Sequence, residues 1–398
     1  VLEDSSPQPR LVVRSLWPEV RTGIISRLFS RPDDGVFMTS RPGTSTSPRG
    51  WHVHKFGGTS LGDPDCFRRV ADILLDEAVP RQAVVVSAMA KTTDALLGLV
   101  VAAEQSASDV GDRIDAIATR YRATVAALLK QKQNVDEILK TFSADLADVG
   151  DVLRAITLVR QAGERSRDLI AGYGELWSSR LLAAYLTERA RAFAGSRPVH
   201  WIDARDLIVI ERGEMGPAVQ WDESHANARR IFTESTFGIT VVTGFIASER
   251  NGLPTTLGRN GSDFSASIVG ALLDAEKITI WTDVDGVMSA DPNRVPEAAI
   301  ISSLSYSEAM ELAYFGAKVI HPQTMSPAVQ RAIPIWIRNT FNPAAPGSLI
   351  GPNSDSSQPI KGVTAVDDVA LLNIEGAGMI GVPGTADRLF GALREAGI

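Results

Sequence analysis

The sequence predicts an α/β protein with a mostly parallel sheet covered by helices on both faces. Short apolar segments typical of strands alternate with longer helical segments, and this alternation is typical of a sheet between two helical layers. The segment Ala83–Ser87 is apolar at almost every position, as expected for a strand that is buried on both faces. With 398 residues, the chain is long enough for two or three domains.

The composition excludes several classes of protein. No run of about 18 apolar residues occurs, so we expect no membrane-spanning helix. A net charge of −7 argues against a general nucleic-acid-binding protein. The single cysteine, Cys66, excludes a disulfide framework and a Cys-based zinc site, and the five histidines show no metal-ligand spacing. The sequence therefore indicates a soluble enzyme or sensor in a reducing compartment, without a resident metal.

Residues 1–50 differ from the rest of the chain. They contain seven Arg, no Lys, eight Ser, four Thr and six Pro, without a sustained amphipathic pattern. We expect a mostly disordered leader. Its Arg and Ser content resembles an organelle transit peptide, whereas its five acidic residues argue against one. The leader is thus either a transit segment or an unstructured extension, and the expected location is either the plastid (chloroplast) or the cytoplasm.

From Trp51 onward, strands and helices can be assigned in order. His52–Phe56 is a short strand, and Pro64 opens a helix that runs to about Glu77. Residues 93–192 are mainly helical. Further strands are expected at His200–Asp203, Ile239–Ile246, Ile278–Thr282 and Ile333–Ile337, with helices at 263–274, 305–316 and 324–331. A linker rich in Pro, Gly, Ser and Asn at 343–362, a strand at Ala370–Ile374 and a helix at Ala386–Glu395 complete the chain.

The segment Lys55-Phe56-Gly57-Gly58-Thr59-Ser60 lies at a strand end just before a helix. Two glycines let the backbone approach a ligand closely, and the helix N-terminus offers unpaired N–H groups. Lys55 adds a positive charge, which favours a polyphosphate site. No Walker A loop is present. For the glycines alone, an ordinary Gly-Gly turn is the alternative.

A second polar segment, Gly258–Ser265, also precedes a helix and contains Arg259, Ser262 and Asp263. Ser262 is a plausible N-cap. A cap does not require the charged pair as well, so we favour a binding site.

Three weaker segments carry charged residues. Asp283 and Asp285 follow a strand end, where α/β sheets place ligands, and either could meet a ribose or Mg²⁺ or belong to an ordinary turn. Lys318 lies in a helix-to-strand turn. Glu175, in Gly172-Tyr173-Gly174-Glu175, is expected at the start of a helix, where it would contact a substrate ammonium or only the helix dipole.

Residues 376–381 fit the dinucleotide fingerprint G-x-G-x-x-G after a strand. Pro383 follows at once and would disrupt a helix that began inside the glycines. We therefore do not expect NAD to bind here.

Taken together, K-F-G-G-T-S, G-R-N-G-S-D, W-T-D-V-D-G and F-G-A-K-V-I-H-P resemble the segments of aspartate kinases, in the amino-acid kinase family, in the same order. The resemblance covers about residues 51–350, and K-F-G-G-T-S distinguishes it from acetylglutamate, glutamate and uridylate kinases. Residues 361–398 look like the opening βα unit of an ACT regulatory domain. Their G-A-G-M-I-G-V-P-G stretch is most similar to bifunctional aspartate kinase–homoserine dehydrogenases, including plastid ones.

The resemblance implies a three-layer αβα amino-acid kinase fold followed by the start of an ACT-type α+β domain. The implied domains are a leader at 1–50, the catalytic domain at 51–345, a linker at 346–362 and a partial ACT domain at 363–398. The implied reaction is ATP-dependent phosphorylation of the β-carboxylate of L-aspartate, with Mg²⁺ bound to the nucleotide, in a homo-oligomer formed through the ACT region. The rest of the regulatory region and any dehydrogenase would lie outside this chain.

The resemblance also implies roles for individual residues. Lys55, Asp263 and Lys318 would be catalytic. Ser87, Thr93, Glu175, Arg259 and Ser262 would surround aspartate. Lys55, Gly57, Gly58, Thr282, Asp283, Arg294 and Lys318 would contact ATP.

Two positions depart from the family pattern, which usually has Tyr after the D-G block and Arg in D-P-R. Here Met288 and Asn293 occupy them, and Arg294 follows one place later. We expect an active enzyme with weakened ATP binding, in which either Arg294 takes over the phosphate contact or the position is simply vacant. The alternative is a catalytically inactive, amino-acid-sensing regulatory protein with the same fold.

Overall fold

The computed structural model describes residues 50–191, 197–213, 216–233, 236–314, 321–354, 360–365 and 384–395. The chain divides into two units, residues 1–47 and 48–398, and the first unit lies outside the described residues. So do Lys318, the expected strand Ala370–Ile374 and the glycine-rich residues 376–381. The following description concerns the second unit.

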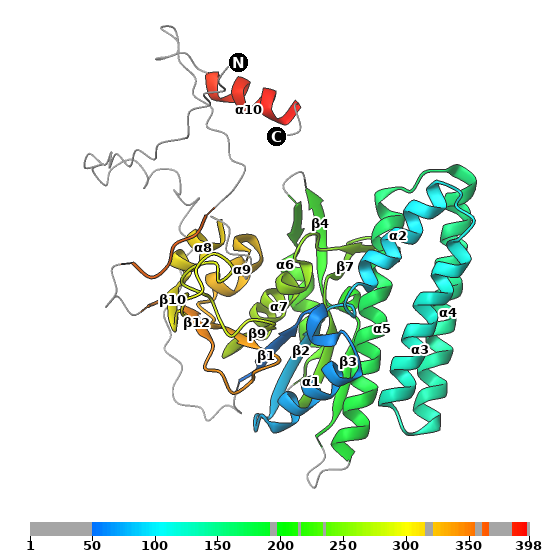
Figure 1. The fold of residues 1–398 in the computed structure, drawn as a ribbon, viewed down its shortest axis with the longest axis horizontal. Helices are drawn as coiled ribbons and strands as arrows, with labels where there is room; N and C mark the ends of the chain where they lie inside the picture. Colours follow the sequence, from blue (N-terminus) through cyan, green and yellow to red (C-terminus); the bar gives the residue numbers. More distant parts are fainter. Residues whose placement is uncertain are drawn as a thin grey trace, which may run out of the picture. The chain divides into compact units, whose positions relative to one another are not determined.

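The main sheet has eight strands, and the prediction of a mostly parallel sheet is confirmed (Figure 1). Its order is β10 (Ser303–Ser305), β12 (Ser348–Gly351), β11 (Ile335–Asn339), β9 (Lys277–Thr282), β1 (His52–Phe56), β2 (Arg81–Val86), β6 (Gly238–Thr243) and β3 (Val199–Ile202). Every neighbouring pair is parallel except β11 and β12. Residues Ala83–Val86 of β2 are completely buried, which explains their continuous apolar sequence.

Two helical layers follow from the direction in which the chain crosses the sheet. The connections through α1 (Pro64–Asp76) and α5 (Glu164–Arg191) run toward β3, whereas those through α6 (Trp221–Ile231), α7 (Gly261–Leu272) and α9 (Pro322–Gln330) run the opposite way. Because parallel crossovers are right-handed, the two sets cover opposite faces. In agreement, α1 packs on α5, and α7 packs on both α6 and α9. The remaining helices include α8 (Tyr306–Tyr314) and α10 (Thr385–Glu395).

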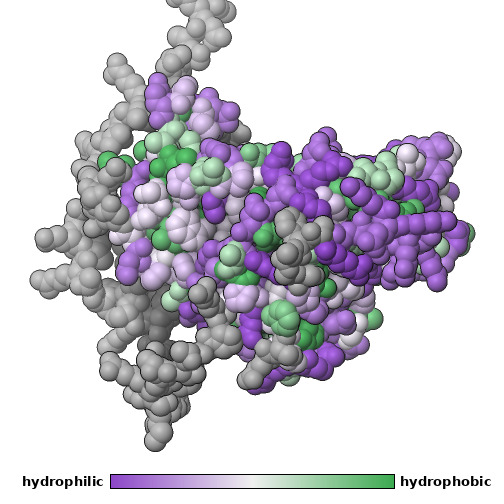
Figure 2. All heavy atoms as spheres, turned by 90° about the horizontal axis from the view of Figure 1, so that it is seen from below, coloured by the Kyte–Doolittle hydropathy of each residue, from purple (hydrophilic) through white to green (hydrophobic). Residues whose placement is uncertain are grey.

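The predicted helical region 93–192 is confirmed. It forms α2 (Thr92–Glu104), α3 (Val110–Leu128), α4 (Lys132–Val159) and α5, which lie side by side (Figure 1). Tyr121, Phe142 and Trp177 form an aromatic cluster between α3, α4 and α5. Each of α3 and α4 buries a single face, and the end of the molecule that they form is mostly hydrophilic in Figure 2. Within the described part of the chain, no helix is both long and apolar enough to span a membrane.

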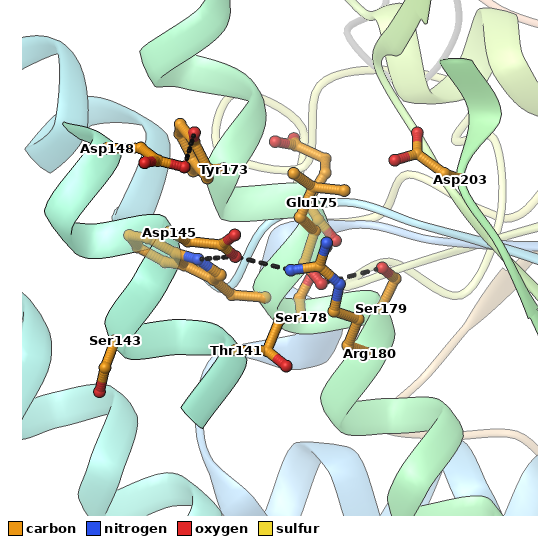
Figure 3. A network of polar contacts seen from close by, with 12 residues as sticks. Thr141, Ser143, Asp145, Asp148, Tyr173, Glu175, Ser178, Ser179, Arg180 and Asp203 are labelled. Atoms are coloured by element: carbon orange, nitrogen blue, oxygen red, sulfur yellow. Dashed lines mark hydrogen bonds and ion pairs between the residues drawn. The ribbon is translucent and has the colours of Figure 1, made fainter. Parts of the chain in front are cut away.

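A polar network ties α4 to α5 (Figure 3). Asp145 on α4 accepts hydrogen bonds from Trp177 Nε1 at 3.0 Å and from Arg180 Nη1 at 2.6 Å. The Arg180 guanidinium lies over the Trp201 ring, 5.0 Å from its centroid. These contacts fix the rotation of α5 about its axis, and therefore the direction in which Glu175 projects.

Two sequence expectations about these segments were wrong in detail, and one sheet was missed. The expected strand Ile239–Ile246 is broken at Phe245, whose φ of 64° is in the left-handed region. The chain then enters a second sheet that was not predicted. It consists of β5 (Gly216–Val219), β4 (Val209–Gly213), β7 (Ile246–Glu249) and β8 (Pro254–Thr256), in that order. The stretch expected as a linker contains β12, which is paired into the main sheet by partners distant in sequence.

Candidate active site

One cavity of about 600 Å³ gathers most of the residues expected in the site. It lies where β1 and β2 end and where α2 and α7 begin, and the middle of α5 forms another part of its wall. The expected residues that line it are Lys55, Gly57, Gly58, Ser87, Thr93, Glu175, Arg259, Ser262 and Asp263. Residues distant in sequence thus converge because parallel strands end at the same edge of the sheet.

The Gly57-Gly58 segment turns from β1 into a short 3-10 helix, Gly58–Leu61. A Cβ atom on Gly58 would lie 3.1 Å from the carbonyl oxygen of Ala88, and one on Gly57 would lie 3.5 Å from Lys55 Nζ. Side chains here would therefore press on the next loop and fill the space beside the ammonium. Without them, the backbone and Lys55 form an open cradle that suits an anion such as phosphate.

Lys55 and Asp263 bring the first two sequence segments together. Lys55 Nζ lies 2.7 Å from Asp263 Oδ1, although Oδ1 accepts no aligned hydrogen bond. The contact is therefore an ion pair that leaves N–H donors of Lys55 free to turn toward a ligand. Asp263 is in the first turn of α7, where the helix dipole favours a negative charge.

The expected N-cap role of Ser262 was wrong. Helix α7 begins at Gly261, and its N-cap is Asn260, which has a φ of 56°. Asparagine adopts this left-handed conformation more readily than most residues. A Cβ atom on Gly261 would lie 2.7 Å from the Phe245 ring, so only glycine fits there. Ser262 is consequently within the first turn, and its side chain lines the cavity.

Glu175 is in the middle of α5, not at a helix start as expected. The glycine beside it serves close packing, since a Cβ atom on Gly174 would lie 2.8 Å from Ala88 Cβ. Glu175 is 3% exposed. Its Oε1 accepts a hydrogen bond from the Ala88 N–H at 3.2 Å, and its Oε2 has no hydrogen-bond partner. Burial raises the pKa of Glu175 to about 8, so this wall of the cavity suits a cationic group.

Ser87 and Thr93 bound the loop that joins β2 to α2. The Ser87 N–H donates to the Phe56 carbonyl at 3.1 Å, and Ser178 Oγ donates to the Ser87 carbonyl at 2.7 Å. Thr93 is in the first turn of α2. Arg259 is exposed, and its guanidinium forms no hydrogen bond or ion pair with another described residue. It is thus available to a substrate carboxylate, which a guanidinium can hold with two hydrogen bonds.

Of the expected nucleotide contacts, Lys55, Gly57 and Gly58 line this cavity, whereas Thr282, Asp283 and Arg294 do not. Thr282 ends β9 and Asp283 follows it. Strand β9 is paired with β1 so that Trp281 lies beside Phe56. Thr282 and Asp283 are therefore at the same edge of the sheet as Gly57, but neither lines the cavity. Arg294 is in an exposed turn in which Asn293 donates twice to Asp291 Oδ1. Lys318 is outside the described residues, so its role stays a prediction.

The sequence analysis did not single out several residues that line the cavity: Met89, Lys91, Asp94, Asp168, Phe245 and Thr256. The sequence could have indicated Asp168, because it precedes Glu175 by seven residues, which is two turns of one helix. It forms an ion pair with Arg212 and accepts a hydrogen bond from Thr256 Oγ1 at 3.1 Å. These contacts join α5 to the second sheet. No sequence pattern could have indicated Phe245, because its left-handed backbone conformation is imposed by the fold.

The cavity has no preformed protein metal centre. Among the described residues, no group of three or more His, Cys, Asp or Glu side chains is placed to hold a metal ion.

The chain is similar to known proteins over most of its length. The family model for the amino acid kinase family matches residues 50–339. Bifunctional aspartokinase/homoserine dehydrogenase 1, chloroplastic, from Zea mays is 39% identical, over 99% of this chain and 43% of that protein. Aspartokinase 1, chloroplastic, from Arabidopsis thaliana is 32% identical, over 87% of this chain and 60% of that protein. The chain thus spans less than two thirds of the length of either relative.

A solved structure shares the fold as well. E. coli aspartokinase III in complex with aspartate and ADP aligns with a TM-score of 0.68 and 31% identity, over 77% of this chain and 65% of that chain. The family match runs from Gly50, two residues before β1, to Asn339, the last residue of β11, and it includes every residue that lines the cavity. On this evidence, the chain belongs to the amino acid kinase family.

Proposed function

We propose that this chain is an aspartate kinase, which transfers the γ-phosphoryl group of ATP to the β-carboxylate of L-aspartate and forms 4-phospho-L-aspartate and ADP. The proposal rests on one cavity in which one part favours an anionic group and another part favours a cationic group. The Gly57-Gly58 cradle beside Lys55 suits a polyphosphate, and the buried Glu175, with one oxygen unbonded, suits the substrate ammonium. Arg259 supplies a guanidinium for a substrate carboxylate.

The chemistry needs no strong base. The β-carboxylate of aspartate is ionised at neutral pH, so one of its oxygens can attack the γ-phosphorus directly. The bond from that phosphorus to the bridging oxygen breaks, and ADP leaves with the electron pair. The main barrier is repulsion between two anions, which positive charges and positioning reduce. Lys55 and the N-termini of α2 and α7 supply this stabilisation.

A magnesium ion that arrives with the nucleotide fits these residues. Mg²⁺ usually keeps several waters and binds one or two carboxylates together with substrate phosphates. Asp263, which is paired with Lys55, and Asp94 both line the cavity and supply carboxylates. When bound, the ion would neutralise charge on the β- and γ-phosphates.

The names of similar proteins support the same activity. The relatives from Zea mays and Arabidopsis thaliana are named aspartokinases, and the E. coli structure contains aspartate and ADP. The alternative of an inactive amino-acid sensor has no observation in its favour, because the cavity retains its charged residues. The bifunctional relatives also support the proposal that this chain is the kinase part of a longer enzyme with a homoserine dehydrogenase.

Several finer proposals depend on the kinase activity. The reaction would be the first step toward lysine, threonine, methionine and isoleucine. The chloroplastic names of the plant relatives favour the plastid over the cytoplasm. We further propose that residues 363–398 begin an ACT domain that mediates homo-oligomer formation and allosteric regulation. The helix expected in this region is present as α10.

The decisive experiment is an assay with hydroxylamine, which traps an acyl phosphate as a hydroxamate. The chain is incubated with MgATP and either L-aspartate, L-glutamate, N-acetyl-L-glutamate or UMP, and ADP is measured in parallel. We expect hydroxamate and ADP to form in equal amounts with L-aspartate alone. Turnover with another acceptor, or none with any, would refute the proposal.

A further inference from the structure

Lys91 is a cation of the cavity that none of the sequence segments included. It occupies the N-cap position of α2, and this exposed residue lines the cavity together with Gly57 and Gly58. The loop that carries it packs directly on these glycines. A Cβ atom on Gly58 would lie 3.1 Å from Ala88 O and 3.5 Å from Ala90 Cα. Lys91 therefore follows the part of the loop that touches the proposed phosphate cradle.

The backbone of Lys91 is in the left-handed region, with a φ of 65° and a ψ of 2°. Glycine adopts this conformation without strain, whereas a lysine does so at a cost. The loop is held in place from outside the cavity. Arg120 on α3 donates to the Ala90 carbonyl at 2.6 Å and to the Gly62 carbonyl at 2.9 Å. The fold thus accepts a strained residue at a position where glycine would serve the backbone better.

The charges of the cavity leave Lys91 available to a ligand. Lys55 is paired with Asp263, and Asp168 is paired with Arg212. Within the described parts of the chain, the Lys91 ammonium forms no ion pair or hydrogen bond. A lysine without a partner, beside a cradle suited to phosphate, is placed to bind an anion that enters the cavity.

We propose that Lys91 contacts the phosphoryl group during its transfer from ATP to the β-carboxylate, and is therefore a catalytic residue. This inference rests on the aspartate kinase activity proposed above. The bond from the carboxylate oxygen to the γ-phosphorus forms while the bond to the bridging oxygen breaks, and the electron pair leaves with ADP. Lys91 keeps its proton throughout. Its ammonium offsets the negative charge on the phosphoryl oxygens, in addition to the charge that Lys55 supplies in the same cavity.

The first test compares two nucleotides in the absence of aspartate. Isothermal titration gives the dissociation constants of ADP and of the imido analogue of ATP, both with Mg²⁺, for the wild-type chain, Lys91→Met and Lys91→Arg. We expect the preference for the triphosphate over ADP to fall about tenfold in Lys91→Met, as for the loss of one charge-assisted hydrogen bond. Lys91→Arg should retain most of it. A Lys91→Met preference within about twofold of the wild type would overturn the proposal.

The second test separates a catalytic role from a structural one. Lys91→Gly removes both the charge and the backbone strain, so the melting temperature should rise while kcat falls about 10²-fold. Arg160→Gly is the matched control. Arg160 has a φ of 55° at the C-cap of α4, so its replacement should raise the melting temperature and leave kcat unchanged. A Lys91→Gly variant with normal kcat would also overturn the proposal.

The two proposals can fail separately. Absence of aspartate-dependent ADP formation by the wild-type chain would refute the kinase activity. The nucleotide preference is measured without aspartate and as a ratio on one preparation, so it reports on Lys91 alone, even if a variant is less stable.

Discussion

Lys55 forms an ion pair with Asp263, and the two atoms, Nζ and Oδ1, are 2.7 Å apart. Lys55 is the penultimate residue of β1, and Asp263 is in the first turn of α7. The pair crosses from the strand that carries the glycine cradle to the helix that follows Arg259. It holds the Lys55 ammonium beside the cradle before any nucleotide binds. An ammonium carries three N–H donors, so Lys55 can keep this ion pair and still donate toward a phosphate.

Lys55→Ala should leave the fold intact and lower kcat by about 10²-fold or more, a loss of roughly 3 kcal/mol of transition-state stabilisation. Circular dichroism and steady-state ADP release measure the two effects. Lys140→Ala, which removes an exposed lysine from α4, is the control and should be fully active. Near-normal turnover by Lys55→Ala would exclude a phosphate role.

Arg259→Lys should weaken the binding of aspartate much more than the binding of ATP. The substitution keeps the charge but loses the planar fork that holds a carboxylate with two hydrogen bonds. We expect the KM for aspartate to rise about tenfold, with the KM for ATP nearly unchanged. Equal changes in both constants would contradict the assignment of Arg259 to aspartate.

The affinity for aspartate should rise with pH up to about 8. Burial raises the pKa of Glu175 to about 8, so below this pH the empty site holds a neutral carboxyl group that must lose its proton before it can pair with the substrate ammonium. Each pH unit below 8 should therefore cost up to about tenfold in affinity. Titrations at pH 7 in two buffers of different ionisation enthalpy should show release of about one proton per aspartate bound.

Glu175→Gln is the matching variant for the pH profile. It should bind aspartate weakly, and neither its affinity nor its proton release should change between pH 6.5 and 8. A wild-type affinity that is flat over this range would show that Glu175 does not pair with the substrate amine.

Arg294→Ala should raise the KM for ATP if Arg294 has taken over a phosphate contact from the preceding position. Asn293→Arg should lower the KM for ATP if that position is simply vacant. Both residues are in the turn that begins at Asp291 and Pro292, outside the cavity. If neither variant changes the ATP dependence, this turn does not reach the nucleotide.

Stability should decrease in acid because of a cluster at the opposite edge of the sheet. Glu77 lies 2.9 Å from His52, 2.8 Å from His54 and 2.9 Å from Lys277. Burial alone would raise the pKa of Glu77, but these contacts lower it well below its usual range. Burial also lowers the pKa of His54, whose Nδ1 accepts a hydrogen bond from Trp281.

Both shifts act in the same direction. Each folded-state pKa lies below its unfolded value, so each group contributes stability above the unfolded pKa that is lost as the pH falls. For His54 the loss begins below about pH 6.5, and for Glu77 below about pH 4.5. Urea unfolding from pH 7 to 4 should show the decline. Glu77→Gln should lower the free energy of unfolding by about 2–3 kcal/mol at pH 7. Glu276→Gln, which changes a more exposed partner of His52, should lower it much less.

The sequence by itself determined the sheet, most of its strands and the segments that meet in the cavity. Continuous apolar runs such as Ala83–Val86 encode burial on both faces locally. The glycines after Lys55 and the charged residues around Ser262 are likewise local signals at strand and helix ends. Their convergence could be expected because parallel strands end at a common edge.

Only the tertiary structure decided which side chains are buried, strained or without a partner. Glu175 is buried at mid-helix, where Gly174 lets α5 approach Ala88 closely, and its raised pKa depends on burial that no local pattern specifies. Phe245 and Lys91 have left-handed backbones that neither residue type favours. The second sheet likewise pairs short strands through partners outside each segment. These features depend on contacts between residues distant in the chain, which propensity and periodicity do not record.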